Sequence, residues 1–229
     1  MMDLGLSPHI RVCIFDVNGV LIDSNLANAQ AMAQAFTDDP ALQERIADQY
    51  LTLGGIDRGT KIRIIQQEVI HRPFEDKEFN LRWERFKSIG SECMRQAPLI
   101  PGCKKVLTEL GRRRMTRAAL SNTPETELQR ILASHGLESL LDIIRGGGDW
   151  PKSESLGQLL QECHVKPDRC LFFGDGKGDL AAARQAGVAF IAIDAGTGEF
   201  AGEDGFEGPY RDLADWGKKV LGMSNNSWF

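Results

Sequence analysis

The sequence predicts an α/β protein whose core is a parallel β-sheet covered by helices on both faces. Short apolar runs of strand length alternate with helical patterns from residue 98 onward, as in consecutive βαβ units. A purely helical stretch separates this region from a first strand near residue 12. We therefore expect a Rossmann-like core domain, residues 1–23 and 98–229, with a helical cap domain, residues 24–97, inserted after the first strand.

The first strand, from Val12 to Phe15, delivers an aspartate to its C-terminal end. Its four apolar residues lead directly into Asp16, and Gly19 follows three positions later. Open parallel sheets bind ligands at the C-terminal ends of their strands. An ordinary Asx turn would explain Asp16 equally well, so a site is indicated only if other polar groups converge on this residue.

The stretch that follows has helical periodicity almost throughout. Ser24 is expected to cap a helix that runs through Phe36 and ends before Pro40. An insertion at this point of an α/β fold sits above the strand ends, where a lid belongs. Two later apolar stripes mark further helices, one at Ile62, Ile65, Val69 and Ile70 and another at Phe79, Trp83, Phe86 and Ile89.

Strands and helices alternate in the remaining chain. Crossovers between such parallel strands are right-handed. The last stretch, 196–229, is glycine-rich and only weakly helical. The expected strands are 116–120, 142–145, 170–173 and 190–193, and the expected helices are 103–110, 124–135, 153–163 and 179–186.

Composition narrows the class of protein. The 229 residues suffice for one large domain or for a core with a smaller attachment, and the net charge of -5 provides no basic footprint for nucleic acid. No apolar run approaches the roughly 18 residues of a membrane span, and the N-terminus does not resemble a signal peptide. Five scattered cysteines without Cys-x-x-Cys spacing indicate a reducing, cytoplasmic setting and no zinc.

Polar groups follow the later strands as well. Ser121 and Asn122 end the second strand, where a hydroxyl and the amides of a helix N-terminus would bind an anion; a simple helix cap is the plainer explanation. Lys152 precedes the next helix and is either solvated or directed toward a phosphate and an aspartate. Neither feature is specific by itself.

Two further carboxylates, Asp175 and Asp179, flank a glycine-rich loop after the buried strand at 170–173. Carboxylate oxygens facing Asp16 at a strand end suit Mg²⁺, which prefers oxygen ligands and retains water. An Asp-Gly turn is the alternative for this loop alone.

Taken together and in order, these four stretches resemble the four motifs of the haloacid dehalogenase-like (HAD) hydrolase superfamily. The resemblance covers about Ile10 to Asp194 and extends into the insertion. There, the stretch from Leu53 to Lys61 is similar to a cap loop of the β-phosphoglucomutase-like and sugar-phosphatase branch. The haloalkanoate dehalogenases of the superfamily do without magnesium and are a poorer match to the acidic loop.

The resemblance implies a role for each matching residue. Asp16 would attack phosphorus and form an aspartyl-phosphate, Ser121 and Asn122 would bind the phosphate, and Lys152 would neutralise charge. Mg²⁺ would be held by Asp16, the backbone carbonyl of Asn18 and Asp175, with Asp179 as a further ligand or as a residue that supports the ligands. Phosphoryl transfer needs such positioning and charge cancellation above all.

Asn18 departs from the family pattern, which has an aspartic acid at this position to protonate the leaving oxygen and later activate water. Asparagine offers hydrogen bonds but cannot exchange a proton in that role. Three explanations stay open: an engineered Asp-to-Asn replacement, a leaving group that needs no proton as in phosphonate-cleaving relatives, or a weak enzyme or phosphometabolite-binding module. Phosphonate cleavage requires a lysine that forms a Schiff base with the substrate, and Lys61 is a weak candidate for it.

The expected function is a magnesium-dependent phosphohydrolase acting on a small phosphorylated metabolite such as a sugar phosphate. Arg58 and Lys61 are candidates for substrate recognition from the cap, or else a solvated helix start. No nucleic-acid or membrane partner is expected. The identity of the substrate and the oligomeric state are not predicted.

Overall fold

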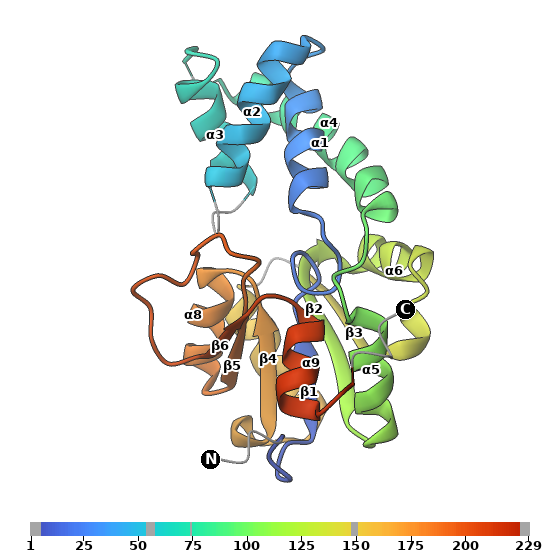
Figure 1. Cartoon of the computed structure of the whole chain (residues 1–229). Coiled ribbons are helices and arrows are strands. Elements are labelled where there is room, and N and C mark those ends of the chain that lie inside the picture. The colour runs from blue at the N-terminus through green and yellow to red at the C-terminus, as the bar shows by residue number, and fades with distance from the viewer. Residues whose placement is uncertain (1–5, 54–57, 74, 148–150, 225–229) are drawn as a thin grey trace. The chain divides into compact units, whose positions relative to one another are not determined.

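The computed structural model describes residues 6–53, 58–73, 75–147 and 151–224. The chain divides into two compact units, which are described separately (Figure 1). The sheet unit comprises Met1–Ile22 and Leu99–Phe229, and the helical unit comprises Asp23–Pro98. The Gly54-Gly55-Ile56-Asp57 stretch that resembles a cap loop lies outside the described residues.

The sheet contains six parallel strands in the order β3-β2-β1-β4-β5-β6. The chain begins at the centre, builds β2 and β3 on one side, and then crosses to β4 on the other side of β1. The strand order therefore reverses between β1 and β4, which is where such sheets bind ligands. The predicted α/β class with a helical insertion after the first strand is confirmed. The strands are β1 (Val12–Phe15), β2 (Thr116–Pro124), β3 (Ile143–Gly147), β4 (Cys170–Gly174), β5 (Ala189–Ile193) and β6 (Glu207–Tyr210).

The second strand is longer than predicted and changes the setting of Ser121. It continues to Pro124, which pairs with Gly147 after a shift of register beyond Leu120. Glycine makes this pairing possible, because a Cβ at Gly147 would lie 2.4 Å from the carbonyl oxygen of Asn122. Ser121 thus lies within a strand and not in the turn before a helix.

Helices cover both faces of the sheet because its central strands, β1 and β4, are buried along their whole length. On one face, Phe15 stacks on Phe173 at 4.5 Å and Phe173 meets Trp216 edge-on at 4.8 Å. On the other, Ile14 and Phe172 belong to a buried cluster with residues of α7 and α8. The helices of this unit are α5 (Cys103–Arg112), α6 (Glu125–Ser134), α7 (Lys152–Glu162), α8 (Lys177–Ala186) and α9 (Leu213–Leu221), with 3₁₀ turns at Glu138–Leu140 and Pro167–Arg169.

The helical unit has its own apolar core, with α1 packed against both α2 and α4. Met32, Ile46 and Phe86 are fully buried in it. Ser24 stands at the N-cap position of α1 but makes no capping hydrogen bond, so the predicted cap is wrong; the chain there is helical rather than extended. The helices are α1 (Asn25–Phe36), α2 (Pro40–Thr52), α3 (Arg58–Glu68) and α4 (Asp76–Gln96).

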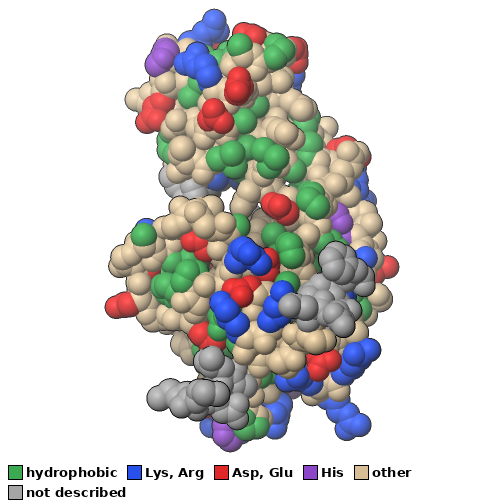
Figure 2. Space-filling model, in the orientation of Figure 1, with side chains coloured by type: hydrophobic (Ala, Val, Ile, Leu, Met, Phe, Trp, Pro, Cys, Tyr) green, Lys and Arg blue, Asp and Glu red, His purple; other side chains and the backbone are tan. Residues whose placement is uncertain are grey.

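The surface mixes charges of both signs. On the face drawn in Figure 2, Lys and Arg side chains lie among Asp and Glu side chains in both units. All five cysteines are free thiols. Within the described residues, no helix combines the length and the apolar character that a membrane span requires.

A side-chain cap at α9 provides a test of local stability in the sheet unit. Asp212 accepts a hydrogen bond of 2.7 Å from the backbone amide of Asp215. Replacing Asp212 by alanine should lower the free energy of unfolding by about 1 kcal/mol, because that amide loses its acceptor. Asp212→Asn keeps an acceptor oxygen and should retain most of the stability. Urea unfolding followed by circular dichroism measures both variants, and equal losses would contradict the capping role.

Candidate acidic site at the ends of β1 and β4

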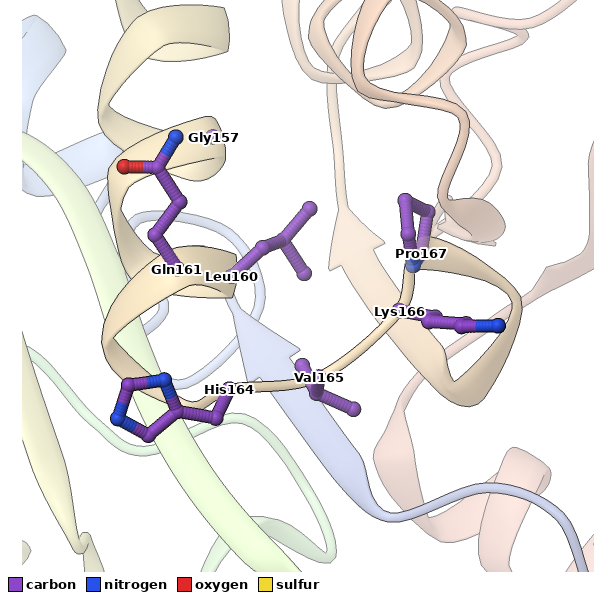
Figure 3. Close-up of a pocket in the computed structure, with 7 residues that line it drawn as sticks. All are labelled: Gly157, Leu160, Gln161, His164, Val165, Lys166 and Pro167. Carbon is purple, nitrogen blue, oxygen red and sulfur yellow. The ribbon is translucent and has the colours of Figure 1, made fainter.

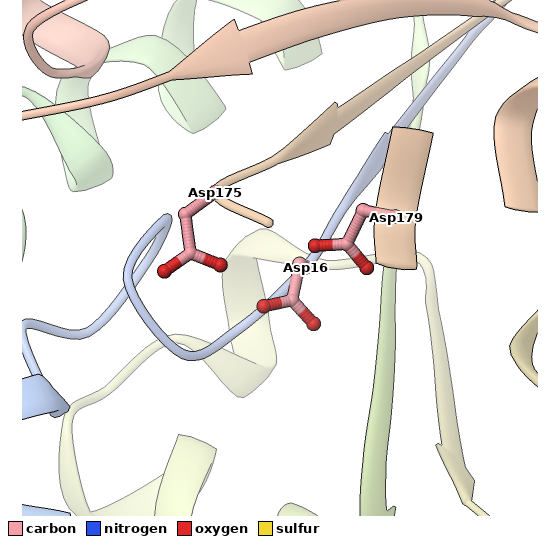
Figure 4. Close-up of side chains that lie close together, drawn as sticks. All are labelled: Asp16, Asp175 and Asp179. Atoms are coloured by element: carbon pink, nitrogen blue, oxygen red, sulfur yellow. The ribbon is translucent and has the colours of Figure 1, made fainter. Parts of the chain in front are cut away.

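Three aspartates meet where β1 and β4 end (Figure 4). Asp16 follows β1 directly, Asp175 follows β4, and Asp179 lies in the first turn of α8. One carboxylate oxygen from each residue can be chosen so that all three lie within 4.8 Å of one another. The first and fourth sequence stretches therefore converge as the sequence led us to expect.

The pairing of the two strands causes this convergence. Phe15 pairs with Phe173 in the parallel register, and the backbone amide of Asp16 donates to the carbonyl of Phe173 at 2.8 Å. Asp16 is thereby fixed beside the last residue of β4, and Asp175 comes immediately after it. The ladder of backbone hydrogen bonds sets the distance between the two carboxylates.

Two glycines make room for the carboxylates. Gly19 has φ +77°, and a Cβ on it would lie 1.8 Å from Oδ2 of Asp175. Its amide donates to the carbonyl of Ile22 at 2.8 Å, which closes the turn after β1. At the end of β4, a Cβ on Gly174 would lie 2.5 Å from the Cβ of Asp179. A side chain at either position would displace a carboxylate of the cluster.

Lys152 binds two of the three aspartates. Its Nζ lies 2.5 Å from Oδ1 of Asp16 and 2.5 Å from Oδ1 of Asp179. It also lies over the ring of Phe172, 5.6 Å from its centroid. Lys152 is the first residue of α7, and it points into the site. Of the two alternatives that the sequence left open for this lysine, the solvated one is wrong.

Burial and charge have opposite effects on these groups. Burial raises the pKa of Asp16 to about 6, and the nearby Lys152 limits the rise. Burial alone would lower the pKa of Lys152, but Asp16 and Asp179 raise it above its ordinary value, so the ammonium stays charged. When all are ionised, three carboxylates and one ammonium leave two negative charges at the site.

The residues present fit a divalent cation. The donors are carboxylate oxygens alone, which is the ligand set that Mg²⁺ prefers. The two negative charges that Lys152 does not offset would be balanced by one divalent cation. The close approach of Gly19 to Asp175 keeps that carboxylate directed toward the turn that carries Asn18. A backbone bridge joins Asn18 to Ile22 in the same turn.

Two buried hydroxyls lie on the strand next to β1. The amide of Thr123 donates to Oγ of Ser121 at 3.2 Å, and the hydroxyl of Ser121 donates to Oγ1 of Thr123 at 3.2 Å. Asn122, between them, is exposed. Thr123 was not among the predicted site residues, although its position two residues after Ser121 on a strand places both on one face.

The N-terminus of α6 is less suited to an anion than the sequence suggested. Pro124 occupies the N-cap position and the helix begins at Glu125, with Glu127 also in the first turn. Two carboxylates already lie where the helix dipole would attract an anion. The hydroxyls of β2 are therefore better candidates for binding an anion than the α6 amides.

Arg58 and Lys61 belong to the helical unit, where both pack on aromatic rings. The guanidinium carbon of Arg58 lies 5.4 Å from the centroid of the Phe86 ring, and Nζ of Lys61 lies 3.9 Å from that of Tyr50. Lys61 is only 8% exposed. Lys61 is therefore not a solvated residue at the start of a helix.

A separate shallow hollow of about 680 Å³ lies at the other end of α7 (Figure 3). It borders the last turn of that helix and the segment leading into β4, whereas Lys152 lies in the first turn. None of the clustered aspartates lines it. The lining residues are Gly157, Leu160, Gln161, His164, Val165, Lys166 and Pro167.

Comparison with known proteins gives consistent results. The family model for haloacid dehalogenase-like hydrolases matches residues 10–187. The phosphoglycolate phosphatase of Vibrio parahaemolyticus is 27% identical over 196 residues, which cover 82% of this chain and 85% of that protein. The phosphoglycolate phosphatase of Synechococcus elongatus is 29% identical over 188 residues, with 80% and 84% covered.

Solved structures show the same fold. A haloacid dehalogenase-like family hydrolase from Streptococcus pneumoniae has a TM-score of 0.67 at 20% identity, covering 84% of this chain and 89% of that chain. CbbY from Rhodobacter sphaeroides, solved in complex with phosphate, has a TM-score of 0.65 at 21% identity, covering 85% and 92%.

Replacing Gly19 by alanine tests the packing of the turn against Asp175. The new methyl group would collide with Oδ2 of Asp175, and the positive φ would cost roughly 1–2 kcal/mol of stability in an L-residue. We expect Mg²⁺ binding, measured by calorimetric titration, to weaken by about 10- to 100-fold.

Gly157→Ala in α7 is the matched control. A Cβ there meets nothing within 4 Å, so the variant should keep the Mg²⁺ affinity of the wild type and gain about 0.5–1 kcal/mol of stability. If Gly19→Ala bound Mg²⁺ as tightly as the wild type, the close packing of Gly19 against Asp175 would not be needed for binding.

Proposed function

The chain belongs to the haloacid dehalogenase-like hydrolase family, and from its acidic site we propose that it is a Mg²⁺-dependent phosphohydrolase of a small phosphorylated metabolite. Lys152 supports this function most directly, because its ammonium lies 2.5 Å from both Asp16 and Asp179 while Asp175 stands beside them. Two anions, a carboxylate nucleophile and a phosphate, approach each other only where cations offset their repulsion.

In the proposed reaction, a carboxylate oxygen of Asp16 attacks phosphorus and the bond from phosphorus to the ester oxygen breaks. Water then attacks the phosphorus of the aspartyl-phosphate, the bond from phosphorus to the Asp16 oxygen breaks, and phosphate leaves while Asp16 returns to its carboxylate form. Lys152 holds Oδ1 of Asp16 and so fixes the orientation of the nucleophile. With a pKa of about 6, Asp16 is mostly ionised at neutral pH, as a nucleophile must be.

Asp16, Asp175 and the backbone carbonyl of Asn18 would hold Mg²⁺, with Asp179 as a further ligand or a support for Lys152. When bound, the cation supplies positive charge that offsets the charge on the phosphate. Ser121 would donate to a phosphate oxygen and Asn122 would contribute at the same strand end. The buried position of the Ser121 hydroxyl supports this assignment.

The substrate we propose is a small phosphate monoester. Relatives named phosphoglycolate phosphatases, matched over more than four fifths of their length, make phosphoglycolate the first compound to assay, followed by sugar phosphates. The helical unit would act as a cap that excludes water. Arg58 and Lys61 would recognise the rest of the substrate from that unit.

Asn18 supports a second candidate, a phosphometabolite-binding module that turns over negligibly. An amide side chain can neither protonate the leaving oxygen nor accept a proton from water. Phosphonate cleavage is the other reading of Asn18, and it predicts that borohydride traps a substrate imine on Lys61. The absence of such an adduct would remove it.

Restoring a carboxyl group at residue 18 separates the enzyme from the binding module. Asn18→Asp should raise kcat for phosphate monoesters by about 10²- to 10⁴-fold, because it supplies the missing proton donor and acceptor. Phosphate release from phosphoglycolate and a panel of sugar phosphates measures the gain. Asn80→Asp, the same change at an exposed position of α4, is the control. No gain across the panel would favour the binding module.

The nucleophile and the cation are tested in the Asn18→Asp background. Asp16→Asn should reduce phosphate release to the background rate while circular dichroism shows an unchanged fold, since an amide is a poor nucleophile. EDTA should abolish the activity of the parent, and added Mg²⁺ should restore it. If phosphate release continued in EDTA, the reaction would not require a divalent cation. If Asp16→Asn still released phosphate, Asp16 would not be the nucleophile.

A further inference from the structure

The loop that follows β5 leaves the sheet at the same edge as the acidic site, because β5 pairs in parallel with β4. Its first turn is organised by Asp194. That carboxylate accepts from the amides of Gly196, Thr197 and Gly198 at 2.9, 2.6 and 3.0 Å, and from the Thr197 hydroxyl at 2.8 Å. Four hydrogen bonds to one side chain hold residues 194–198 in a single conformation.

The other end of this turn is fixed in the hydrophobic core. Phe200 is buried, and its ring centroid lies 5.8 Å from that of Phe190 and 5.3 Å from that of Phe206. Glu199 stands between the Asp194 turn and Phe200. Its backbone is therefore held on both sides, so the contact of its side chain requires no further ordering of the loop backbone.

The contact that Glu199 makes is with the start of α8. Its Oε1 accepts from the backbone amide of Lys177 at 3.2 Å. The N-cap residue of α8 is Gly176, which has no side chain and makes no capping bond. The first amides of a helix have no acceptor within the helix, and a carboxylate near them is favoured by the helix dipole. Glu199 thus supplies, from another loop, the cap that Gly176 lacks.

The capped turn is the one that carries the acidic site. Asp175 precedes it and Asp179 lies within it, with the amide of Asp179 bonded to the carbonyl of Gly176 at 3.0 Å. Loosening the amide of Lys177 would loosen both carboxylates relative to Asp16 and Lys152. A cation that binds only the converged arrangement would then bind more weakly, in proportion to the time the arrangement is lost.

We infer that Glu199 is a positioning residue of the acidic site, acting through the backbone amide of Lys177 to hold Asp175 and Asp179 in place for a divalent cation. The part concerning the cation rests on the proposed function. The part concerning the amide rests on the hydrogen bond alone.

The same loop contains a matched control. Glu203 bonds the guanidinium of Arg184 at 3.1 Å and lies 3.8 Å from Nζ of Lys177. It therefore links the same loop to the same helix through side chains, without contacting the Lys177 amide. Its removal changes the charge by the same amount and leaves the cap intact.

The experiment compares the full-length wild type with Glu199→Ala, Glu199→Gln and Glu203→Ala. Hydrogen exchange of residues 175–179 measures the cap, and calorimetric titration with Mg²⁺ measures its effect on the site. In Glu199→Ala, exchange should become faster and Mg²⁺ affinity should fall by about threefold to tenfold. Glu199→Gln, which keeps the acceptor oxygen, should lie closer to the wild type, and Glu203→Ala should stay within about twofold of it.

Three results would overturn the inference while leaving the proposed function in place. They are an unchanged Mg²⁺ affinity in Glu199→Ala, equal losses in the alanine and glutamine variants, and an equal loss in Glu203→Ala. A wild-type chain that binds no Mg²⁺ would overturn the proposed function and, with it, the role of Glu199 at the site.

Discussion

One buried ammonium group holds the acidic site together. Asp16 and Asp179 carry like charges in a place with little water, an arrangement that favours protonation of one of them. Lys152 lies 2.5 Å from an oxygen of each and offsets that repulsion. Removing the lysine would leave the carboxylates without a compensating charge and would be strongly destabilising. The fold must therefore bring the end of β1 and the starts of α7 and α8 to one place together.

The topology of the sheet satisfies this requirement. Because the strand order reverses between β1 and β4, the loops after these two strands start side by side, and α7 and α8 pack together on one face. The positions of the carboxylates then depend on two glycines, which have no Cβ atom. Gly19 and Gly174 lack the Cβ atoms that would strike Asp175 and Asp179, so the two side chains can lie close to the backbone of these glycines.

The sequence predicts the parts of this structure that depend on local patterns. Apolar runs indicated the central strands and hence the order in which polar groups reach the sheet edge. Contacts between residues far apart in the sequence could not be predicted from these patterns. The extension of β2 depends on Gly147 in another strand, and the cap that Glu199 provides depends on a folded loop. The strand β6 contains Gly208 and Pro209 and has one buried residue in four, so it shows no alternation to detect. The inward direction of Lys152 also required the structure.

In the proposed reaction, proton transfer and charge cancellation are carried by different residues, so an asparagine at residue 18 affects only proton transfer. Lys152 offsets the charge of Asp16 and Asp179, so the loss of this lysine would leave both carboxylates without a cation. Residue 18 is half-buried and lies outside those ion pairs. An aspartate there would add a further negative charge in the turn after Asp16, beside a cluster that already has two unbalanced negative charges, and this would favour its protonated form. Asparagine avoids this repulsion and leaves the ion pairs of Lys152 with Asp16 and Asp179 unchanged.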